Sequence, residues 1–191
     1  MATTLSHTLG DLTSLARRVA CTDRAEEACD PDAAFDRCLD LLVGCGGAGG
    51  AVLWVGNGGS AALASHFAVD VFNAGVRSMA FNDAALLTCM GNDCGYEQVF
   101  ARPVALFASP GDVLIAISSS GRSPNIIKAV GAARARGCAV VTLSGFRPDN
   151  PLRGLGDWNF FVPSEAYGPV EMVHALICHA LVDALKERRR G

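Results

Sequence analysis

From residue 51 onward the sequence alternates short apolar runs with segments of helical periodicity, and this alternation constrains the fold more than any other feature. The runs expected to form strands are Ala51–Val55, Arg77–Phe81, Val113–Ser118, Ala139–Leu143 and Trp158–Val162. The segments expected to form helices are Ser60–Phe72, Tyr96–Phe107, Asn125–Arg136 and about Val170–Lys186. Apolar strands separated by helices are typical of a parallel sheet that is covered on both faces. We therefore predict an α/β protein with a five-stranded parallel sheet flanked by helices.

Two amphipathic helices are expected ahead of the first strand. Apolar residues recur at three- and four-residue steps from Leu5 to Val19, and a second helix is predicted to begin at Pro31 and to end in the glycine run 44–50. The length of 191 residues suits one domain, and the sequence contains no repeat. We expect a single domain over residues 1–191, with a helical oligomerisation segment at 1–50 and a sheet-forming unit at 51–186. The apolar stripes of the two helices need a partner surface, which predicts a homo-oligomer.

The charge balance argues against two classes of partner. Half of the residues are hydrophobic, 18% are charged, and the formal net charge is -3. Such a chain has no general basic field to attract nucleic acid or an anionic membrane surface. We expect neither partner, and we interpret the basic stretch Arg188–Arg190 as a solvated tail.

The cysteine pattern and the hydropathy indicate a cytoplasmic protein. The eight cysteines contain no Cys-x-x-Cys pair, and several lie in apolar segments, where a free cysteine behaves as a small buried hydrophobe. No stretch approaches the roughly 18–20 uninterrupted apolar residues that a spanning helix needs. The first ten residues also lack the basic start and apolar run of a secretion signal.

Two loops at strand ends carry the candidate chemistry. Ligands of parallel sheets bind beyond the carboxyl ends of the strands. The loop Gly56–Ser60 combines glycines with a helix start, where a ligand can approach free N–H groups; it could equally be a tight strand-to-helix turn. The loop Ser118–Ser123 gathers four hydroxyls around Gly121. Hydroxyls and amides can surround a phosphate without a basic side chain. A helix cap would need only one serine, so we favour phosphate binding.

Further segments make the pattern specific. They are Ser65–Ala68, Gly91–Tyr96, Gly111–Leu114, Val140–Gly145 and the pair His174 and His179. With the two loops and the two N-terminal helices, the chain over about residues 5–186 resembles the phosphoheptose isomerases of the sugar isomerase (SIS) domain family. The resemblance implies a single-domain, flavodoxin-like SIS fold and a homotetramer with sites at subunit boundaries. It also implies an aldose–ketose isomerase, an intramolecular oxidoreductase, that converts sedoheptulose 7-phosphate to a heptose 7-phosphate through an enediol.

The resemblance assigns roles to individual residues. Those expected to bind the phosphate or the sugar are Asn57, Gly58, Ser60, Asp93, Ser118, Ser119, Ser120, Ser123 and Glu171. Asp70 and His179 are the implied acid/base pair. The implied zinc ligands, one ion per subunit, are His66, Asp70, Glu171 and His179. The spacing agrees, because His66 and Asp70 are four apart and share a helix face. We expect His174 to be structural and Asp93 to lie in a loop.

The sequence departs from the family around the sugar. The family usually has Glu where this chain has Asp70, and Gln where it has Glu171. Asn73 and Ala74 stand where the family has an arginine. A shorter carboxylate and an added charge make a different substrate reasonable, so a seven-carbon sugar phosphate and an eight-carbon relative both stay open, as do the anomer and the pathway.

Metal content and catalysis each leave a second hypothesis open. The pocket could be metal-free, with Asp70 and His179 acting as acid and base alone. The chain could also be a non-catalytic SIS-fold sugar-phosphate sensor or protein-interaction module, because the serine loop suits either role. His179 with an acidic partner favours the enzyme.

Overall fold

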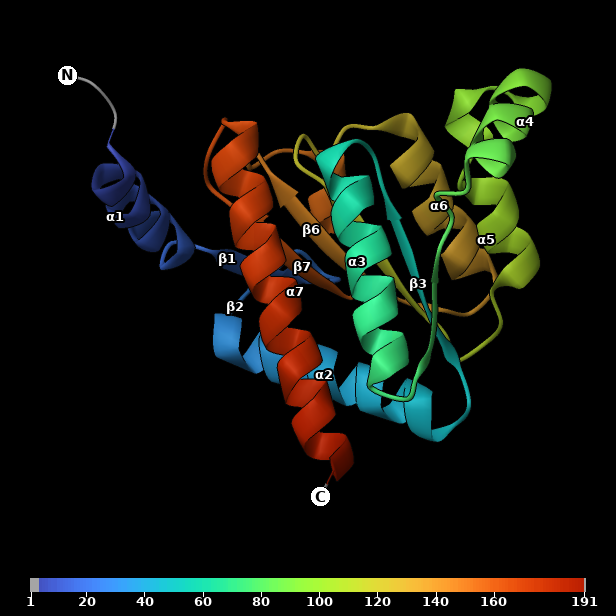
Figure 1. The fold of residues 1–191 in the computed structure, drawn as a ribbon, viewed down its shortest axis with the longest axis horizontal. Coiled ribbons are helices and arrows are strands. Elements are labelled where there is room, and N and C mark those ends of the chain that lie inside the picture. The colour runs from blue at the N-terminus through green and yellow to red at the C-terminus, as the bar shows by residue number, and fades with distance from the viewer. Residues whose placement is uncertain (1–3, 191) are drawn as a thin grey trace.

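A computed structural model describes residues 4–190 and confirms the α/β fold class (Figure 1). The helices are α1 (Leu5–Ala16), α2 (Pro31–Gly47), α3 (Gly59–Asn73), α4 (Ala84–Cys94), α5 (Ala101–Phe107), α6 (Pro124–Ala135) and α7 (Tyr167–Arg190). Short 3-10 helices, η1 and η2, cover Tyr96–Gln98 and Pro151–Gly154. The strands are β1 (Ala20–Asp23), β2 (Ala28–Cys29), β3 (Ala51–Gly56), β4 (Arg77–Ala80), β5 (Val113–Ser118), β6 (Ala139–Gly145) and β7 (Trp158–Val162).

The strand order places the binding crevice. The sheet runs β2-β1-β7-β6-β5-β3-β4, and the five strands from β7 to β4 are mutually parallel. The chain goes outward from β3 to β4 and then returns past β3 to β5, so the strand order reverses between β3 and β5. In open α/β sheets, ligands bind at this switch point, outside the carboxyl ends of the strands. The glycine loop follows β3 and the serine loop follows β5, so both predicted loops lie there.

Helices cover both faces of the sheet (Figure 1). One core layer joins α2, α3 and α7 to the face that carries Trp54 and Ile115. The other joins α5 and α6 to the face that carries Leu53 and Leu114. All residues of β3 and β5 are buried, which explains why both read as continuous apolar runs.

The structure corrects the number of strands. It has seven, because β1 and β2 form an antiparallel hairpin that pairs with β7 through β1. The predicted helix Tyr96–Phe107 is also interrupted between η1 and α5. Pro103 cannot lie in a helix interior without breaking a backbone hydrogen bond, but its missing N–H is tolerated in a first turn. A new helix, α5, therefore begins at Ala101, with Pro103 in its first turn.

An additional helix, α4, lies where a loop was expected. It begins after Asp83, whose carboxylate accepts a hydrogen bond from the Leu86 N–H at 2.9 Å. Asp93 is therefore in the last turn of a helix and not in a loop. Asn92 and Asp93 are exposed, while Leu86, Leu87 and Met90 pack against the core.

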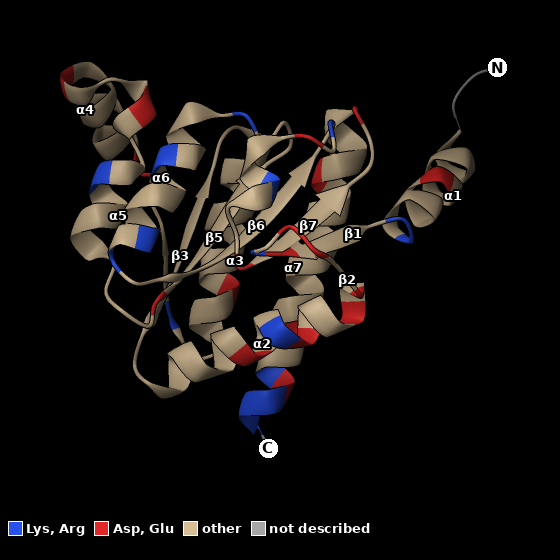
Figure 2. Cartoon of the chain, turned by 180° about the vertical axis from the view of Figure 1, so that it is seen from behind, with Lys and Arg blue, Asp and Glu red and all other residues tan. Residues whose placement is uncertain are grey.

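The basic end of the chain is not a free tail. Figure 2 shows acidic residues along α2 beside the basic end of α7. Arg188 Nη1 lies 2.6 Å from Asp40 Oδ1. Arg189 donates to the carbonyls of Ala74 and Gly75 at the carboxyl end of α3. A cation at this position interacts favourably with the partial negative charge of the helix dipole. The interpretation of a purely solvated tail is wrong for these two arginines.

Helix α7 owes its apolar composition to its buried face. Among residues 4–190 it is the one helix long and apolar enough to cross a membrane by length and composition. Val173, Cys178, Leu181 and Leu185 are buried against the sheet and its covering helices. These contacts are those of a core helix in an α/β protein.

Candidate active site

The backbone of the glycine loop is built so that little but glycine fits. A Cβ on Gly56 would lie 2.5 Å from the Ser60 carbonyl oxygen, and Gly58 has φ +56°. A Cβ on Gly59 would collide with the carboxylate of Glu171. At the start of α3 the loop therefore has backbone groups that no side chain covers, and the Glu171 carboxylate lies next to Gly59. Ser60 is buried in the first turn of α3.

The hydroxyls of the serine loop are not used as a helix cap. Ser123 is the N-cap residue of α6, yet its side chain makes no capping hydrogen bond and instead pairs with Ser118, Oγ to Oγ at 3.3 Å. Ser120 Oγ accepts from the Arg122 N–H at 3.3 Å. The Ser119 hydroxyl is buried and has no partner among the described residues. Buried polar groups are rarely left unbonded, so the loop is suited to bind a ligand with acceptor oxygens.

A side-chain bridge joins the two loops across the switch point. The amides of Asn57 and Asn125 exchange hydrogen bonds of 3.0 and 2.8 Å, and the Tyr96 hydroxyl donates to Asn57 Oδ1 at 3.2 Å. These residues line a cavity of about 340 Å³ together with Glu97, Ser123 and Pro124. Asn125 and Tyr96 were not predicted from the sequence. Each had a signal: Asn125 is polar in the first turn of an apolar helix, and Tyr96 closes a glycine-rich segment.

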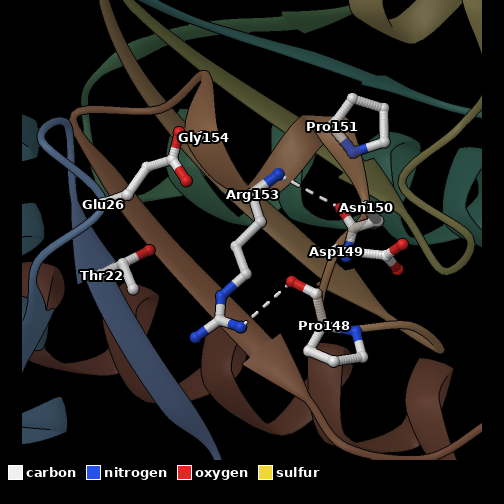
Figure 3. Close-up of a pocket in the computed structure, with 8 residues that line it drawn as sticks. All are labelled: Thr22, Glu26, Pro148, Asp149, Asn150, Pro151, Arg153 and Gly154. Atoms are coloured by element: carbon white, nitrogen blue, oxygen red, sulfur yellow. Dashed lines mark hydrogen bonds between the residues drawn. The ribbon is translucent and has the colours of Figure 1, made fainter.

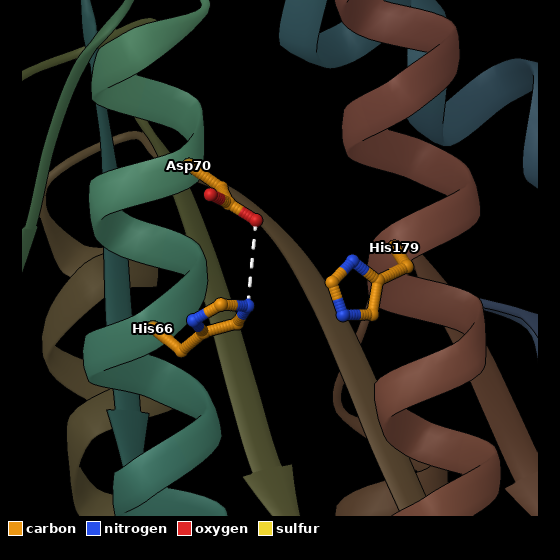
Figure 4. Close-up of side chains that lie close together, drawn as sticks. All are labelled: His66, Asp70 and His179. Carbon is orange, nitrogen blue, oxygen red and sulfur yellow. Dashed lines mark ion pairs between the residues drawn. The ribbon is translucent and has the colours of Figure 1, made fainter.

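An imidazole–carboxylate group lies in the space between α3 and α7 (Figure 4). His66, Asp70 and His179 each offer a ligand atom, and these three atoms lie within 4.8 Å of one another. His66 Nε2 is 3.4 Å from Asp70 Oδ2, and the two imidazole ring centroids are 5.3 Å apart. The ring of Phe67 packs edge-on against both imidazoles.

Glu171 lies outside this group, contrary to the expected four-ligand set. It precedes His179 by eight residues, which separates the two by about 12 Å along α7 at 1.5 Å per residue. Its carboxylate lies instead at Gly59, near the loops.

Asp93 is exposed on α4, and its hydrogen bonds are to Asn92 at 2.7 Å and to Cys89. The Asn92 hydrogen bond lowers the pKa of Asp93.

His174 is structural, as expected. It is fully buried, and its Nε2 lies 3.1 Å from the Ser144 carbonyl oxygen behind the serine loop. Burial lowers the pKa of His174 from 6.5 to about 4, so the ring is neutral at neutral pH.

This neutral histidine predicts acid sensitivity in one pH window. Between pH 6.5 and about 4 the unfolded chain binds a proton at His174 that the folded chain does not bind, so stability falls with pH, by up to about 3 kcal/mol. Urea unfolding at pH 7 and pH 5 samples part of this window and should show a loss of about 2 kcal/mol. His174→Gln should flatten the pH slope, and the exposed His7→Gln should leave it unchanged. Equal slopes for the parent protein and His174→Gln would contradict the assignment.

Comparison with known proteins agrees with this architecture. The SIS domain family model matches residues 20–145. The phosphoheptose isomerase of Thiobacillus denitrificans is 42% identical over 154 residues, 76% of this chain and 78% of that protein. The phosphoheptose isomerase of Klebsiella pneumoniae is 39% identical over 166 residues, 83% of this chain and 86% of the relative. The structure of phosphoheptose isomerase GmhA from Neisseria gonorrhoeae superposes with a TM-score of 0.85 at 29% identity, covering 96% of this chain and 97% of that one. The chain therefore belongs to the SIS domain family, and within it to the phosphoheptose isomerases.

Proposed function

We propose that this protein is an aldose–ketose isomerase of a seven-carbon sugar phosphate, interconverting sedoheptulose 7-phosphate and a heptose 7-phosphate. The observation that carries the proposal is that one chain combines hydroxyls at the switch point with an imidazole–carboxylate group on α3 and α7. The first feature suits a phosphate and the second suits proton transfer. A sensor or interaction module would need the first feature alone, so the acidic and imidazole group favours the enzyme.

The phosphate is assigned to the serine loop. Ser118, Ser119, Ser120 and Ser123 surround the amino end of α6, where N–H groups and the helix dipole favour an anion. The Arg122 guanidinium turns to Asp149, at 3.2 Å, so the loop acts through neutral donors. The sugar hydroxyls are assigned to Asn57, Gly58, Ser60 and Glu171 at the other loop, with Asp93 as a further prediction.

Asp70 and His179 are assigned to the chemistry. Isomerisation requires removal of a proton from C1 or C2 and its return to the neighbouring carbon. One of these two groups takes the proton, and the other moves a proton between the two oxygens of the cis-enediol. The His66 ring, 3.4 Å from the Asp70 carboxylate, orients that carboxylate.

We assign one zinc ion per subunit to His66, Asp70 and His179. Two imidazole nitrogens and one carboxylate oxygen form a donor set that zinc takes, and three protein ligands leave one coordination position open. A bound zinc would polarise the sugar carbonyl. In the metal-free alternative the same Asp70 and His179 act as acid and base alone.

A homotetramer is proposed because the surface around this group is apolar. Val69 and Phe72 on α3 are 58% and 66% exposed, and Leu176 on α7 is 56% exposed. Helix α1 packs Leu12 and Leu15 against α7 and β7, while its first turns project from the molecule (Figure 1) and expose Leu5 and Leu9. Of the proposed oligomerisation segment, residues 1–50, α2 packs in this chain's own core, so α1 is the part assigned to contacts with other subunits. Subunits that cover these faces would exclude water from the site. Light scattering at micromolar concentration should give four times the 19.8 kDa chain mass, and a monomer would oppose the proposal.

The proposed compartment is the cytoplasm. All eight cysteines are free, and burial raises the pKa of the Cys21 thiol to about 12, which leaves it unreactive.

The direct test of function is an isomerisation assay. Incubation with sedoheptulose 7-phosphate, followed by NMR of the sugar, should show a heptose 7-phosphate forming until equilibrium. A panel of seven- and eight-carbon ketose phosphates would identify the preferred substrate. Tight binding without turnover across the panel would instead support the non-catalytic sensor.

The serine loop gives a prediction for affinity. The double change Ser119→Ala and Ser120→Ala removes two donors, and hydrogen bonds to a charged group contribute about 1.5–3 kcal/mol each. The dissociation constant for the sugar phosphate should rise at least about tenfold in calorimetry. Ser109→Ala, exposed near the amino end of β5, is the control and should change nothing. Unchanged affinity in the double variant would overturn the phosphate assignment.

A further inference from the structure

Asn150 is a buried amide behind the serine loop. It is 3% exposed and lies between β6 and η2, where it caps η2 by accepting from the Arg153 N–H at 3.1 Å (Figure 3). Its Nδ2 donates to Ser144 Oγ and the Gly145 carbonyl at 3.2 Å, and to the Arg147 carbonyl at 2.9 Å. Both ends of the amide are therefore fixed by hydrogen bonds, to the last residues of β6 and to the segment that follows them.

The same side chain supports the serine loop at Gly121. This glycine has φ +60°, and a Cβ on it would collide with Asn150 Oδ1, so the amide fills the space next to the loop backbone. Two backbone bonds join the same segments. The Leu152 N–H donates to the Gly121 carbonyl at 3.1 Å, and the Gly145 N–H donates to the Ser119 carbonyl at 2.9 Å.

We propose that Asn150 is a positioning residue for phosphate binding. This rests on the proposed function, because it assumes that the serine loop holds the phosphate. Glycine populates several backbone regions, so Gly121 needs an external contact to keep one conformation. Asn150 supplies that contact and joins it to the anchored end of β6. Ser119 and Ser120 are thereby held in place before the phosphate arrives, and this preorganisation strengthens binding. Asn150 itself lies behind the loop and does not touch the phosphate.

The competing explanation is that Asn150 only stabilises the fold as a helix cap. Asn159 offers a matched control for that explanation. It is also fully buried, and its Nδ2 donates to the carbonyls of Thr22, Asp23 and Gly156. Its Oδ1 accepts from Thr142 Oγ1 and the Gly156 N–H. Asn159 thus makes a comparable set of bonds, and none of them is to the serine loop.

The experiment compares Asn150→Ala and Asn159→Ala in the full chain. Calorimetry gives Kd for sedoheptulose 7-phosphate and for inorganic phosphate, steady-state kinetics gives KM and kcat, and thermal unfolding gives Tm. We expect Asn150→Ala to raise both Kd values and KM on the order of tenfold with kcat changed less than about twofold. Asn159→Ala should lower Tm at least as much and leave both Kd values unchanged. Unchanged Kd values in Asn150→Ala, or equal changes in the two variants, would overturn the proposal.

A second variant covers the case in which Asn150→Ala does not fold. Asn150→Asp keeps the size and the oxygen next to Gly121 but replaces the Nδ2 donor by an acceptor, so the side chain loses its anchoring bonds to Ser144, Gly145 and Arg147. This variant should bind inorganic phosphate more weakly than the parent and should bind unphosphorylated sedoheptulose with unchanged affinity. Equal phosphate affinity in the variant and the parent would overturn the proposal. Phosphate binding by a parent protein that does not isomerise the sugar would refute the proposed activity and leave this test intact. A parent that binds neither ligand would refute both.

Discussion

Replacement of Asp70 by Asn is expected to lower kcat for the isomerisation by a factor on the order of 10²–10⁴, the usual contribution of a positioned acid or base. The amide has the shape of the carboxylate but cannot accept a proton. Binding of the sugar phosphate should change little, because the phosphate is assigned to the serine loop at the start of α6 and not to α3. Steady-state kinetics and calorimetry on the same preparation measure the two effects separately.

Two variants control this prediction. Asp183→Asn removes a carboxylate from the exposed face of α7, where its partner is Lys186 at 3.6 Å, and should leave kcat unchanged. Asp70→Glu restores the residue that the family usually has and adds one methylene of reach, so it should retain activity. Parental turnover by Asp70→Asn would remove Asp70 from the chemistry and leave His179 as the sole candidate.

The parallel part of the fold was predictable because burial on both faces leaves a direct trace in the sequence. β3 and β5 are buried along their whole length and therefore read as unbroken apolar runs. β1 and β2 leave no such trace. They have four and two residues, and their positions in the sheet come from pairing with β7 and with each other. Helix α4 was missed because Gly91, Asn92 and Asp93 in its last turn have the composition of a loop.

The candidate site was predictable where it depends on local sequence. The glycine and serine loops follow directly from strand ends, and the His66–Asp70 pair follows from a four-residue helical spacing. The place of the Glu171 carboxylate at Gly59 depends on how α7 packs beside α3, which the spacing of residues within α7 does not reveal. The Asn57–Asn125 bridge joins residues 68 positions apart, so only the strand order could bring them together.

The zinc assignment leads to the prediction with the clearest structural control. The chain contains a second histidine–aspartate pair with the same helical spacing, because His7 Nδ1 lies 3.2 Å from Asp11 Oδ2 on α1. Among the described residues the candidate metal group contains His66, Asp70 and His179, and the α1 pair is not part of such a group. Two ligands on an exposed helix should bind zinc far more weakly than three that converge from two helices.

His66→Ala is therefore expected to abolish zinc binding, while His7→Ala leaves it intact. Metal analysis of protein purified without a histidine tag should find about one zinc per chain in the parent and in His7→Ala, and none in His66→Ala. His66→Ala should lose activity together with the metal. Chelation should remove activity from the parent, and added zinc should restore it, because the deprotonated ligands are still in place to bind the ion. In the metal-free alternative, His66→Ala is mild because this ring only orients Asp70, and His179→Ala is severe because it removes a proton carrier. Full activity after exhaustive chelation, with no metal detected beforehand, would end the zinc assignment and leave Asp70 and His179 as an acid–base pair.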